Sequence, residues 1–532
     1  MKTTLPFLFL IISVLATAQV TKTVNVSNQG TLSSLAKDFL STVTNLTVKG
    51  NIDARDVKCM RDQMPMLVEL DISAVSIQAY TGIGGTYNDI YETAYPANEM
   101  PQYSFWTTIA GTGITKNTLK NITLPITINS IGNYAFQEGS GITNLSLPSG
   151  VTNIGQNAFN GCSAISGTLN LPNSITSIGS LAFCGCSAIT GTLILPNSIV
   201  YLGDGAFAGC SNITGSLTIP STLSSIGIYT FSITSINEFI VSSTNQKYSS
   251  FNGVLFNKDQ TTIIQYPFLK KGAYIVPNSV TNIGDYAFYG CTGITNITFS
   301  TMFSSIGSYA FYFCNALKEF IVPNNNQTFS TLSGVIFNKN QTTIIQCPAG
   351  KEGTYAVPNS VINIGDYAFG TCQFINTLIF PSSLTSVGIC AFENCIGIKT
   401  IYSLNPNPPE LYYPGCFDYP NLVTNIYVPT DAAVVAYKSS GYWYYFSDDI
   451  IKKGVPNALT DLLNNRIKVY STPYGIKIEG VPVREKIIIY TINGKLIQSI
   501  EADNTSIIIP SRTLSKGMYL VKISGIIYKV IL

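Results

Sequence analysis

Apolar residues return along the middle of the chain in two linked patterns. The first is Leu-x-x-Leu-x-Leu-Pro, as in Leu119, Ile122, Leu124 and Pro125. Its last apolar positions alternate with polar ones, which is typical of a strand with one buried face, and the proline predicts the end of that strand. The second pattern is Ile-Gly-x-x-Ala-Phe, first seen over 131–136. We expect its glycine to turn the chain with a positive φ and its phenylalanine to fill the interior.

The second pattern occurs nine times and therefore marks an array of repeats. The steps between successive phenylalanines are 23, 24, 24, 24, 57, 23, 58 and 23 residues. A period in the low twenties is typical of leucine-rich repeats rather than of helical pairs or propeller blades. One repeat cannot bury its apolar side alone, so the parallel strands of successive repeats are expected to stack. The phenylalanines are Phe136, Phe159, Phe183, Phe207, Phe231, Phe288, Phe311, Phe369 and Phe392.

The two long steps contain a second duplication. Residues 253–267 match residues 334–348 at an offset of 81. In each copy, short apolar runs flank a polar tetrad, and this pattern predicts a hairpin inserted into the repeat, over about 239–277 and 320–358. Such insertions often lie on the binding face of a solenoid, although a plain spacer fits the pattern equally well.

The N-terminus has the features of a secretory signal peptide. Lys2 precedes an apolar run over 7–15, and the A-x-A pattern over 16–18 predicts cleavage between Ala18 and Gln19. The apolar run is too short for a stable membrane span. No later stretch approaches 18 uncharged apolar residues, so we expect an exported mature chain without a transmembrane segment.

A different pattern takes over from about residue 464. About seven short apolar runs follow within 70 residues, which predicts a small β-sandwich. Residues 456–532 carry ten basic and five acidic side chains, a local net charge of +5. We therefore expect a separate module at the C-terminus.

Both parts resemble known families. The nine repeats resemble the BspA-like leucine-rich repeats of bacterial surface proteins over about 119–429, with a similar N-terminal flank over 45–131 and a similar closing repeat and cap over 408–437. The segments Ile487–Tyr490, Asn493–Leu496 and Gly517–Lys522 resemble the type A sorting domain of type IX secretion. These resemblances imply an outer-membrane translocon as one partner and either display at the cell surface or release. They also imply relatives that bind host or neighbouring-cell proteins.

The patterns together predict a β-rich leucine-rich-repeat solenoid with a parallel sheet and a period of 23–24, followed by a small C-terminal β-sandwich. The expected segments are a signal peptide over 1–18, an N-terminal flank with the first irregular repeats over 19–115, the array over 116–429, a cap and linker over 430–463, and the sorting domain over 464–532.

Composition narrows the chemistry that the chain can perform. Charged residues make up 11 % of the 532 residues, and the net charge is +2, which supplies no concentrated basic surface for nucleic acid. The chain contains no histidine, which excludes Ser-His-Asp and Cys-His catalysis and histidine-ligated metals. A hydrolase without histidine would need a carboxylate motif, and the sequence offers none. We predict that the protein is not an enzyme and has no catalytic residue, cofactor or metal.

The twelve cysteines follow the repeat. Seven lie three residues after the repeated phenylalanine, so we expect a ladder of reduced, buried thiols. Neighbouring strands lie about 4.7–4.9 Å apart, which leaves disulfides between adjacent repeats as an alternative. The seven are Cys162, Cys186, Cys210, Cys291, Cys314, Cys372 and Cys395.

The strand residues that should point outward are the candidate ligand-facing positions. They form a long, nearly uncharged series that suits a protein or glycan, although good strand formers alone would give the same pattern. We predict an extracellular or cell-surface binding or adhesion module that is exported by type IX secretion. The alternative is a structural surface-layer or matrix component without a specific ligand. The positions are Thr123, Ser146, Asn170, Ile194, Thr218, Ile240, Thr298, Ile321, Ile379, Tyr402 and Tyr427.

Overall fold

The computed structural model describes most of the chain beyond the predicted signal peptide. The described residues are 19–87, 90–109, 112–412, 414–417, 420–446, 448–455, 467–481, 485–504, 506–514, 516–523 and 526–532. Residues 1–18, with Ala18 of the predicted cleavage site, and part of the predicted linker lie outside them. The chain forms two compact units: unit 1 is Met1–Asn212 with Ser225–Gly227, and unit 2 is Ile213–Ser224 with Ile228–Leu532.

Unit 1 begins with a parallel ladder whose strand order is β1-β2-β3-β9. Between β2 and β3 the helix α2 starts at a capping box, in which the Asp53 carboxylate accepts a backbone N–H and the Asp56 carboxylate accepts the N–H of Asp53. The elements are β1 (Thr21–Val26), α1 (Leu32–Leu35), β2 (Asn45–Ile52), α2 (Ala54–Asp62), β3 (Glu69–Ile77) and β9 (Asn121–Thr123), with two antiparallel pairs, β4 (Tyr80–Gly82) with β5 (Thr93–Tyr95) and β7 (Trp106–Ile109) with β8 (Thr112–Thr115).

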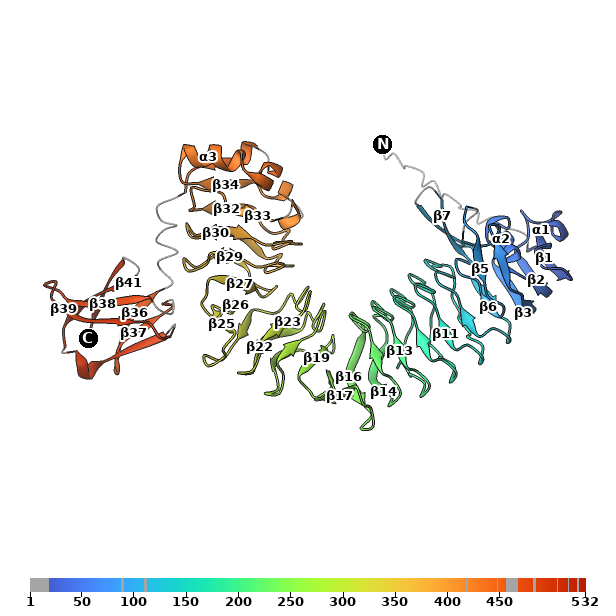
Figure 1. Ribbon diagram of the computed structural model, residues 1–532, viewed down its shortest axis with the longest axis horizontal. Helices are drawn as coiled ribbons and strands as arrows, with labels where there is room; N and C mark the ends of the chain where they lie inside the picture. Colours follow the sequence, from blue (N-terminus) through green and yellow to red (C-terminus); the bar gives the residue numbers. More distant parts are fainter. Residues whose placement is uncertain are drawn as a thin grey trace, which may run out of the picture. The chain divides into compact units, whose positions relative to one another are not determined.

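A second parallel ladder in unit 1 is built from the Ile-Gly phrase itself. Each repeat, here called a rung, contributes a two-residue strand, and the isoleucine or leucine of one rung pairs with that of the next. We call this series the Ser-Ile ladder (Figure 1). Its strands are β6 (Glu99–Met100), β10 (Ser130–Ile131), β11 (Asn153–Ile154), β12 (Ser177–Ile178), β13 (Tyr201–Leu202) and β15 (Ser225–Ile226).

The glycine of the phrase has a different role from the one predicted. Gly132 and Gly179 have no positive φ, so the expectation of a left-handed turn at the glycine is wrong. A Cβ atom on Gly179 would lie 2.6 Å from the backbone nitrogen of Gln156 in the preceding rung. Glycine is therefore required because two rungs approach closely. The left-handed residue lies two positions later, at Tyr134 (φ 59°) and at the matching position of every later rung.

The predicted strands of the Leu-x-x-Leu-x-Leu-Pro pattern do not form one continuous ladder. Among the described residues, the rungs of Leu145, Leu169 and Leu193 contain no assigned strand there, only isolated bridges such as that between Gly167 and Ile189. Each rung of 24 residues contains an extra glycine with a φ of about 80°, such as Gly167, which the rung of 23 residues lacks. Where the ladder resumes, the register shifts at the matching Gly215, which is a bulge.

Phenylalanine fills the interior of unit 1, as predicted. Phe136, Phe159 and Phe183 are fully buried, and successive rings stack with centroids 5.2 and 5.3 Å apart. Each stacked ring covers the apolar face that the neighbouring rung would otherwise expose.

Unit 2 continues the rungs but interrupts the ladders at two hairpins. Its first sheets are β14 (Thr214–Ile219) with β16 (Ser235–Val241), then β17 (Tyr248–Phe251), β18 (Val254–Asn257), β19 (Thr262–Gln265), β21 (Asn282–Ile283) and β23 (Ser305–Ile306), and β20 (Gly272–Ile275), β22 (Ile294–Thr298) and β24 (Glu319–Ile321). The next are β25 (Phe329–Leu332), β26 (Val335–Asn338), β27 (Thr343–Gln346), β29 (Asn363–Ile364), β31 (Ser386–Val387) and β33 (Glu410–Leu411), and β28 (Gly353–Ala356), β30 (Ile375–Phe380), β32 (Thr400–Ser403), β34 (Asn425–Val428) and β35 (Ile451–Lys453).

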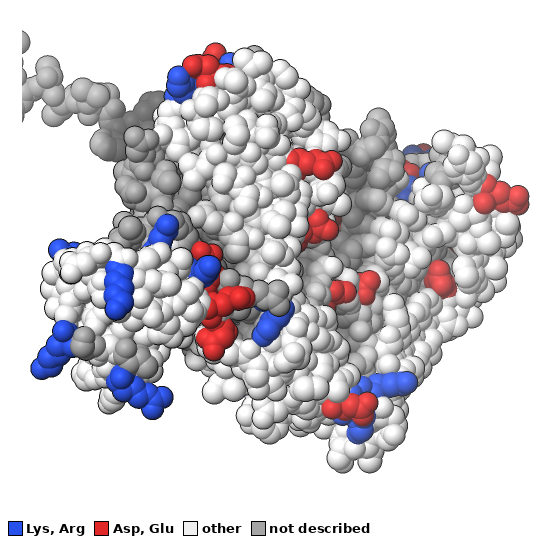
Figure 2. All heavy atoms as spheres, turned by 60° about the vertical axis from the view of Figure 1, so that its left-hand side comes forward, with Lys and Arg blue, Asp and Glu red and all other residues white. Residues whose placement is uncertain are grey.

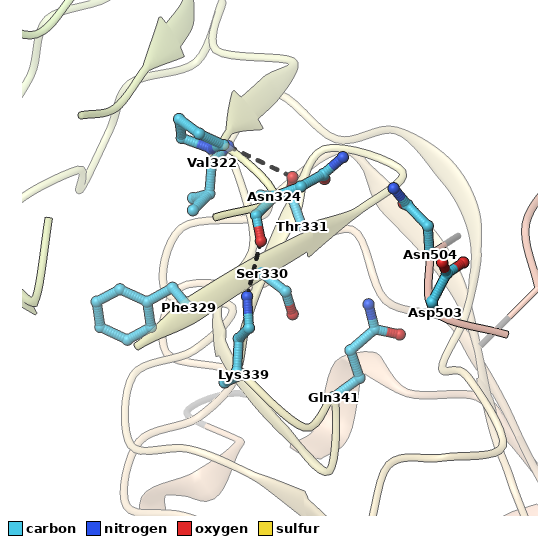
Figure 3. A pocket seen from close by; sticks show the side chains of 10 residues that line it. Val322, Asn324, Phe329, Ser330, Thr331, Lys339, Gln341, Asp503 and Asn504 are labelled. Atoms are coloured by element: carbon cyan, nitrogen blue, oxygen red, sulfur yellow. Dashed lines mark hydrogen bonds between the residues drawn. The ribbon is translucent and has the colours of Figure 1, made fainter. Parts of the chain in front are cut away.

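Each hairpin takes the place of one Ser-Ile strand. Strands β18 and β19 pair antiparallel, and β19 then pairs parallel with β21; β26, β27 and β29 repeat this arrangement. A fully buried asparagine holds each hairpin: the side-chain amide of Asn245 donates to the carbonyls of Pro220 and Leu223, and its oxygen accepts from two backbone N–H groups. In the second hairpin Lys339 Nζ donates to the carbonyl of Asn324 at 2.9 Å (Figure 3).

The array closes with a cap and is followed by a sandwich. Helix α3 (Asp431–Lys438) starts at Thr430, whose side chain accepts the N–H of Ala433, and the buried Trp443 donates to the carbonyl of Pro409. The 3-10 turns are η1 (Pro414–Cys416), η2 (Pro420–Leu422), η3 (Gly441–Tyr445), η4 (Asp448–Ile450) and η5 (Ser511–Thr513). The sandwich sheets are β36 (Lys468–Thr472), β37 (Gly475–Glu479) and β40 (Ser506–Pro510), and β39 (Leu496–Glu501), β38 (Lys486–Thr491), β41 (Met518–Ile523) and β42 (Ile526–Ile531), which share one core.

Candidate functional site

The outward positions of the Leu-x-x-Leu-x-Leu-Pro segments form what we call the strand face. The buried residues alternate with them, because successive side chains of an extended segment point to opposite sides. Seven predicted positions are exposed, three are half-buried and one is buried. The exposed ones are Thr123, Ser146, Asn170, Ile194, Thr218, Ile240 and Ile321; the half-buried ones are Thr298, Tyr402 and Tyr427.

Ile379 differs from its prediction as an outward position. Its side chain is fully buried in a small apolar cluster with Ala356, and Tyr402, Leu404 and Val455 pack against the pair. Val455 lies beyond the cap, so a distant segment returns to cover this part of the strand face. Ile379 is therefore not available to a ligand in this structure.

A hollow opens in the strand face of unit 1, next to the edge of β9. Its volume is about 320 Å³. Two predicted positions, Thr123 and Ser146, line it. Asn121 and Asn144, each two residues earlier, and the exposed Ile126 also line it. The lining thus combines small hydrogen-bonding side chains with apolar carbon, which is the composition of a binding site for an uncharged group.

Carboxylates on the strand face are paired with neutral side chains of an adjacent rung. Asn121 Nδ2 donates to Glu69 Oε1 at 2.9 Å, and Ser216 Oγ donates to Glu238 Oε1 at 2.8 Å. Asn296 Nδ2 makes the same kind of bond to Glu319 at 3.2 Å. Figure 2 shows one face of the molecule, on which charged side chains occur singly or in small groups with wide uncharged surface between them.

The cysteines form hydrogen bonds along the rungs rather than disulfides. All twelve lie within the described residues, and none of them forms a disulfide. The thiol of Cys186 donates to the carbonyl of Phe159 at 3.1 Å, and Cys162, Cys210, Cys314 and Cys395 repeat this bond to the phenylalanine one rung earlier than their own. Burial raises the pKa of Cys162 and of Cys210 to about 12. These thiols stay protonated and inert at neutral pH.

Among the described residues, neither a cluster of potential metal ligands nor a membrane-spanning helix is found. No group of three or more cysteine, aspartate or glutamate side chains there could hold a metal ion. No described helix is long and apolar enough to cross a membrane.

Sequence reasoning missed one surface feature, a column of tyrosines at the left-handed position of the rungs. Tyr229, Tyr286, Tyr309 and Tyr367 all occupy it with positive φ. The tyrosine is visible in the sequence as the fourth residue of Ile-Gly-x-Tyr-Ala-Phe. The sequence alone did not show that the side chains at this position contact one another between rungs.

Comparison with protein families assigns both parts of the chain. The model of the BspA-type leucine-rich repeat region matches residues 107–191, 166–271, 273–352 and 351–461. The model of a secretion system C-terminal sorting domain matches residues 463–531. A comparison with curated proteins gave no match.

Solved structures of leucine-rich-repeat proteins are similar to this chain at low identity. A leucine-rich cell surface protein from Faecalibacterium prausnitzii is 21 % identical, with a TM-score of 0.42, over 61 % of this chain and 94 % of its own. The pneumococcal vaccine antigen PcpA is 19 % identical, with a TM-score of 0.40, over 69 % and 86 %. A leucine-rich repeat protein from Bacteroides ovatus is 21 % identical, with a TM-score of 0.28, over 57 % and 86 %.

The matched repeats cover more than half of the chain, and the matched tail is a signal for type IX secretion, which places the protein outside the cell or at its surface. Neither matched family is catalytic. This chain belongs to the BspA-type leucine-rich-repeat family and is a surface protein exported through its C-terminal sorting domain.

Proposed function

We propose that the protein is a binding or adhesion module that contacts another protein through its strand face. The observation that carries the proposal is the hollow beside β9, which is lined by predicted outward positions and by the exposed Ile126. Apolar carbon combined with a few small hydrogen-bonding groups is what the anchor residue of a protein partner requires. The nearly uncharged surface removes long-range repulsion against partners of either sign.

The sorting domain serves delivery in this proposal. It forms its own core, separate from the cores of the rungs, and is the part handled by the type IX translocon. Binding then belongs to residues 19–455, and the ligand is a protein on another cell or in the surrounding matrix.

The test compares two double variants of the full exported chain. Ser146→Arg with Asn170→Arg adds bulk and charge to two exposed strand-face positions, and Thr152→Arg with Gln156→Arg adds the same to exposed positions on the other side of the rung's proline. All four side chains are exposed, so both variants should fold. Each is used in pull-downs from cell-surface and host-matrix extracts.

We expect the strand-face variant to lose at least tenfold of the captured partner and the control to retain it. Equal capture by both variants would remove the strand face as the binding surface. Assembly of the protein with itself, in the absence of any captured partner, would instead support a structural matrix component.

A further inference from the structure

The left-handed column of unit 2 differs chemically from that of unit 1. In unit 1 it holds Tyr134, Asn157, Leu181 and Gly205, with φ between 54° and 59°. In unit 2 four of its residues are tyrosines, Tyr229, Tyr286, Tyr309 and Tyr367, with φ between 43° and 56°. A left-handed backbone disfavours a bulky side chain by roughly 1–2 kcal/mol, whereas glycine and asparagine adopt it readily. Since Asn157 and Gly205 form the same turn, the rung itself does not require tyrosine.

The four tyrosines form one continuous stack. Ring centroids of Tyr229 and Tyr286 lie 5.0 Å apart, those of Tyr286 and Tyr309 5.1 Å, and those of Tyr309 and Tyr367 5.0 Å. The contact between Tyr229 and Tyr286 joins the rungs before and after the first hairpin, and the contact between Tyr309 and Tyr367 joins those before and after the second. Stacking therefore contributes to packing, and it also holds four half-buried phenol groups rigidly in a row.

Carboxylates flank the stack without being needed by the fold. Asp285 and Asp366 are exposed, and each directly precedes a tyrosine of the stack. Each carboxylate accepts a backbone N–H from the next rung: Asp285 from Ser308 at 2.6 Å, and Asp366 from Ile389 at 2.7 Å. In unit 1 the neutral Asn133 makes the same bond to Gln156 at 2.8 Å. The amide is therefore sufficient for the turn. Unit 1 also has one carboxylate at this position, Asp204, but Asp204 precedes Gly205, whereas Asp285 and Asp366 each precede a stacked tyrosine.

A third carboxylate adds to this acidic environment. Glu393 Oε2 accepts the hydroxyl of Tyr312 at 2.6 Å. Burial raises the pKa of Tyr286, Tyr289 and Tyr309, and the Glu393 carboxylate raises each further. The two flanking positions Ile228 and Ile389 are 40 % and 43 % exposed, which adds apolar contact area.

We propose that these residues form a second interaction surface, the tyrosine edge, which docks a protein segment carrying arginine or lysine. The tyrosine edge comprises the four stacked tyrosines with Asp285 and Asp366. Rigid tyrosines give a large amphipathic contact at low entropic cost, and exposed carboxylates complement guanidinium and ammonium groups. The surface is separate from the strand face and does not depend on ligand binding there.

The test measures binding of the full exported chain to three immobilised probes. They are a twelve-residue arginine–glycine peptide, a glutamate–glycine peptide of the same length and a neutral glucose oligosaccharide. We expect binding to the arginine peptide alone, weakened as NaCl rises from about 0.05 to about 0.5 M because salt screens exposed charge pairs.

Matched variants then locate the binding. Asp285→Asn with Asp366→Asn should weaken binding about five- to tenfold while the turns persist, because asparagine keeps the backbone bond. The control, Asp204→Asn with Asp259→Asn, removes the same charge at the equivalent turn position of unit 1 and at the tip of the first hairpin. Tyr286→Phe with Tyr309→Phe preserves the stack and removes two hydroxyls, with Tyr134→Phe as control.

Three results would overturn the proposal. The arginine peptide could fail to bind, or the aspartate and control variants could weaken its binding equally. Tyrosine-dependent binding of the oligosaccharide would assign the edge to glycans instead. The strand-face variant Ser146→Arg with Asn170→Arg should leave peptide binding unchanged, so this inference and the proposed function can fail independently.

Discussion

The rungs of unit 1 and unit 2 share an interior and differ at their turns. In both, a buried phenylalanine stacks on the next and a buried cysteine follows it by three residues. In unit 1 the position two residues after phenylalanine holds Glu138 and then three glycines, Gly161, Gly185 and Gly209, with φ near 75°. In unit 2 it holds one glycine, Gly290, and four other residues, Ile233, Phe313, Thr371 and Asn394. The interior tolerates little change because each side chain must fit two neighbours, whereas the turns are free to acquire surface chemistry.

The hairpins are the second difference between the units. Unit 1 keeps one Ser-Ile ladder of six strands, whereas unit 2 restarts its ladder at β19 and again at β27. The aromatic turns of unit 2 lie at these restarts, where Tyr309 contacts Tyr367 across 58 residues of sequence. The inserted segments are thus accompanied by aromatic side chains both at the turns and in the core, where the buried Tyr266 stacks on Phe288 with ring centroids 4.7 Å apart.

Loss of a core ring should give the largest effect in both units. Phe159→Ala and Phe288→Ala each remove a fully buried ring that stacks on both sides, and each should lower the free energy of unfolding by about 3–5 kcal/mol. Hydrogen exchange should show lost protection in the mutated rung and its neighbours. Uniform loss over the whole chain would show that the rungs do not behave as a linear stack.

Loss of a hairpin asparagine should affect unit 2 alone. Asn326→Ala leaves the backbone N–H groups of Thr328 and Phe329 without their acceptor and removes donors to the preceding rung, which should reduce stability by about 2–3 kcal/mol. The exposed Asn340→Ala serves as the control. Protease cleavage within 324–343 in the Asn326 variant only would support this role, and cleavage of both would contradict it.

The thiol ladder should make stability fall at alkaline pH in both units. Burial raises the folded pKa of Cys162 and Cys210 to about 12 and that of Cys291 well above 9, so the folded state holds protons that the unfolded state has released. Their contribution is complete below the unfolded pKa of about 8.5 and declines as pH rises towards 12. Denaturant midpoints measured between pH 8 and 11 should decrease, and replacing Cys186 with alanine should reduce the slope.

Native-state labelling gives a second measure of the same ladder. The half-buried Cys184 and Cys390 should react first with a thiol reagent, and the buried ladder cysteines only after unfolding. A native disulfide between Cys162 and Cys186 found by mass spectrometry would contradict the free-thiol structure.

The smallest effect is expected at the glycine that lengthens a rung. Gly191 has a φ of 80°, and the nearest atom to an added Cβ is the Thr168 hydroxyl oxygen at 3.2 Å. Gly191→Ala should therefore lower stability by about 1 kcal/mol through backbone strain. Gly284→Ala in unit 2 should be more disruptive, since its Cβ would lie 2.7 Å from the carbonyl oxygen of Ile263.

Several features could be predicted because they depend on short-range periodicity. The repeat length, the buried phenylalanines and the phase of the cysteines follow from the spacing of apolar residues, since each rung must bury the same side. The free thiols with bonds such as Cys186 to Phe159 agree with the predicted reduced ladder. The family resemblance and the C-terminal sorting domain are likewise shown.

The remaining features depend on contacts between residues far apart in the sequence. The role of the Ile-Gly glycine was misjudged because the atoms that exclude a Cβ on Gly179 belong to the preceding rung. Ile379 is buried because Val455 returns to cover it, and Tyr309 meets Tyr367 only once the second hairpin has been inserted. Local pattern determines what a rung is made of, whereas only the stacked rungs decide which of its side chains remain exposed to bind a partner.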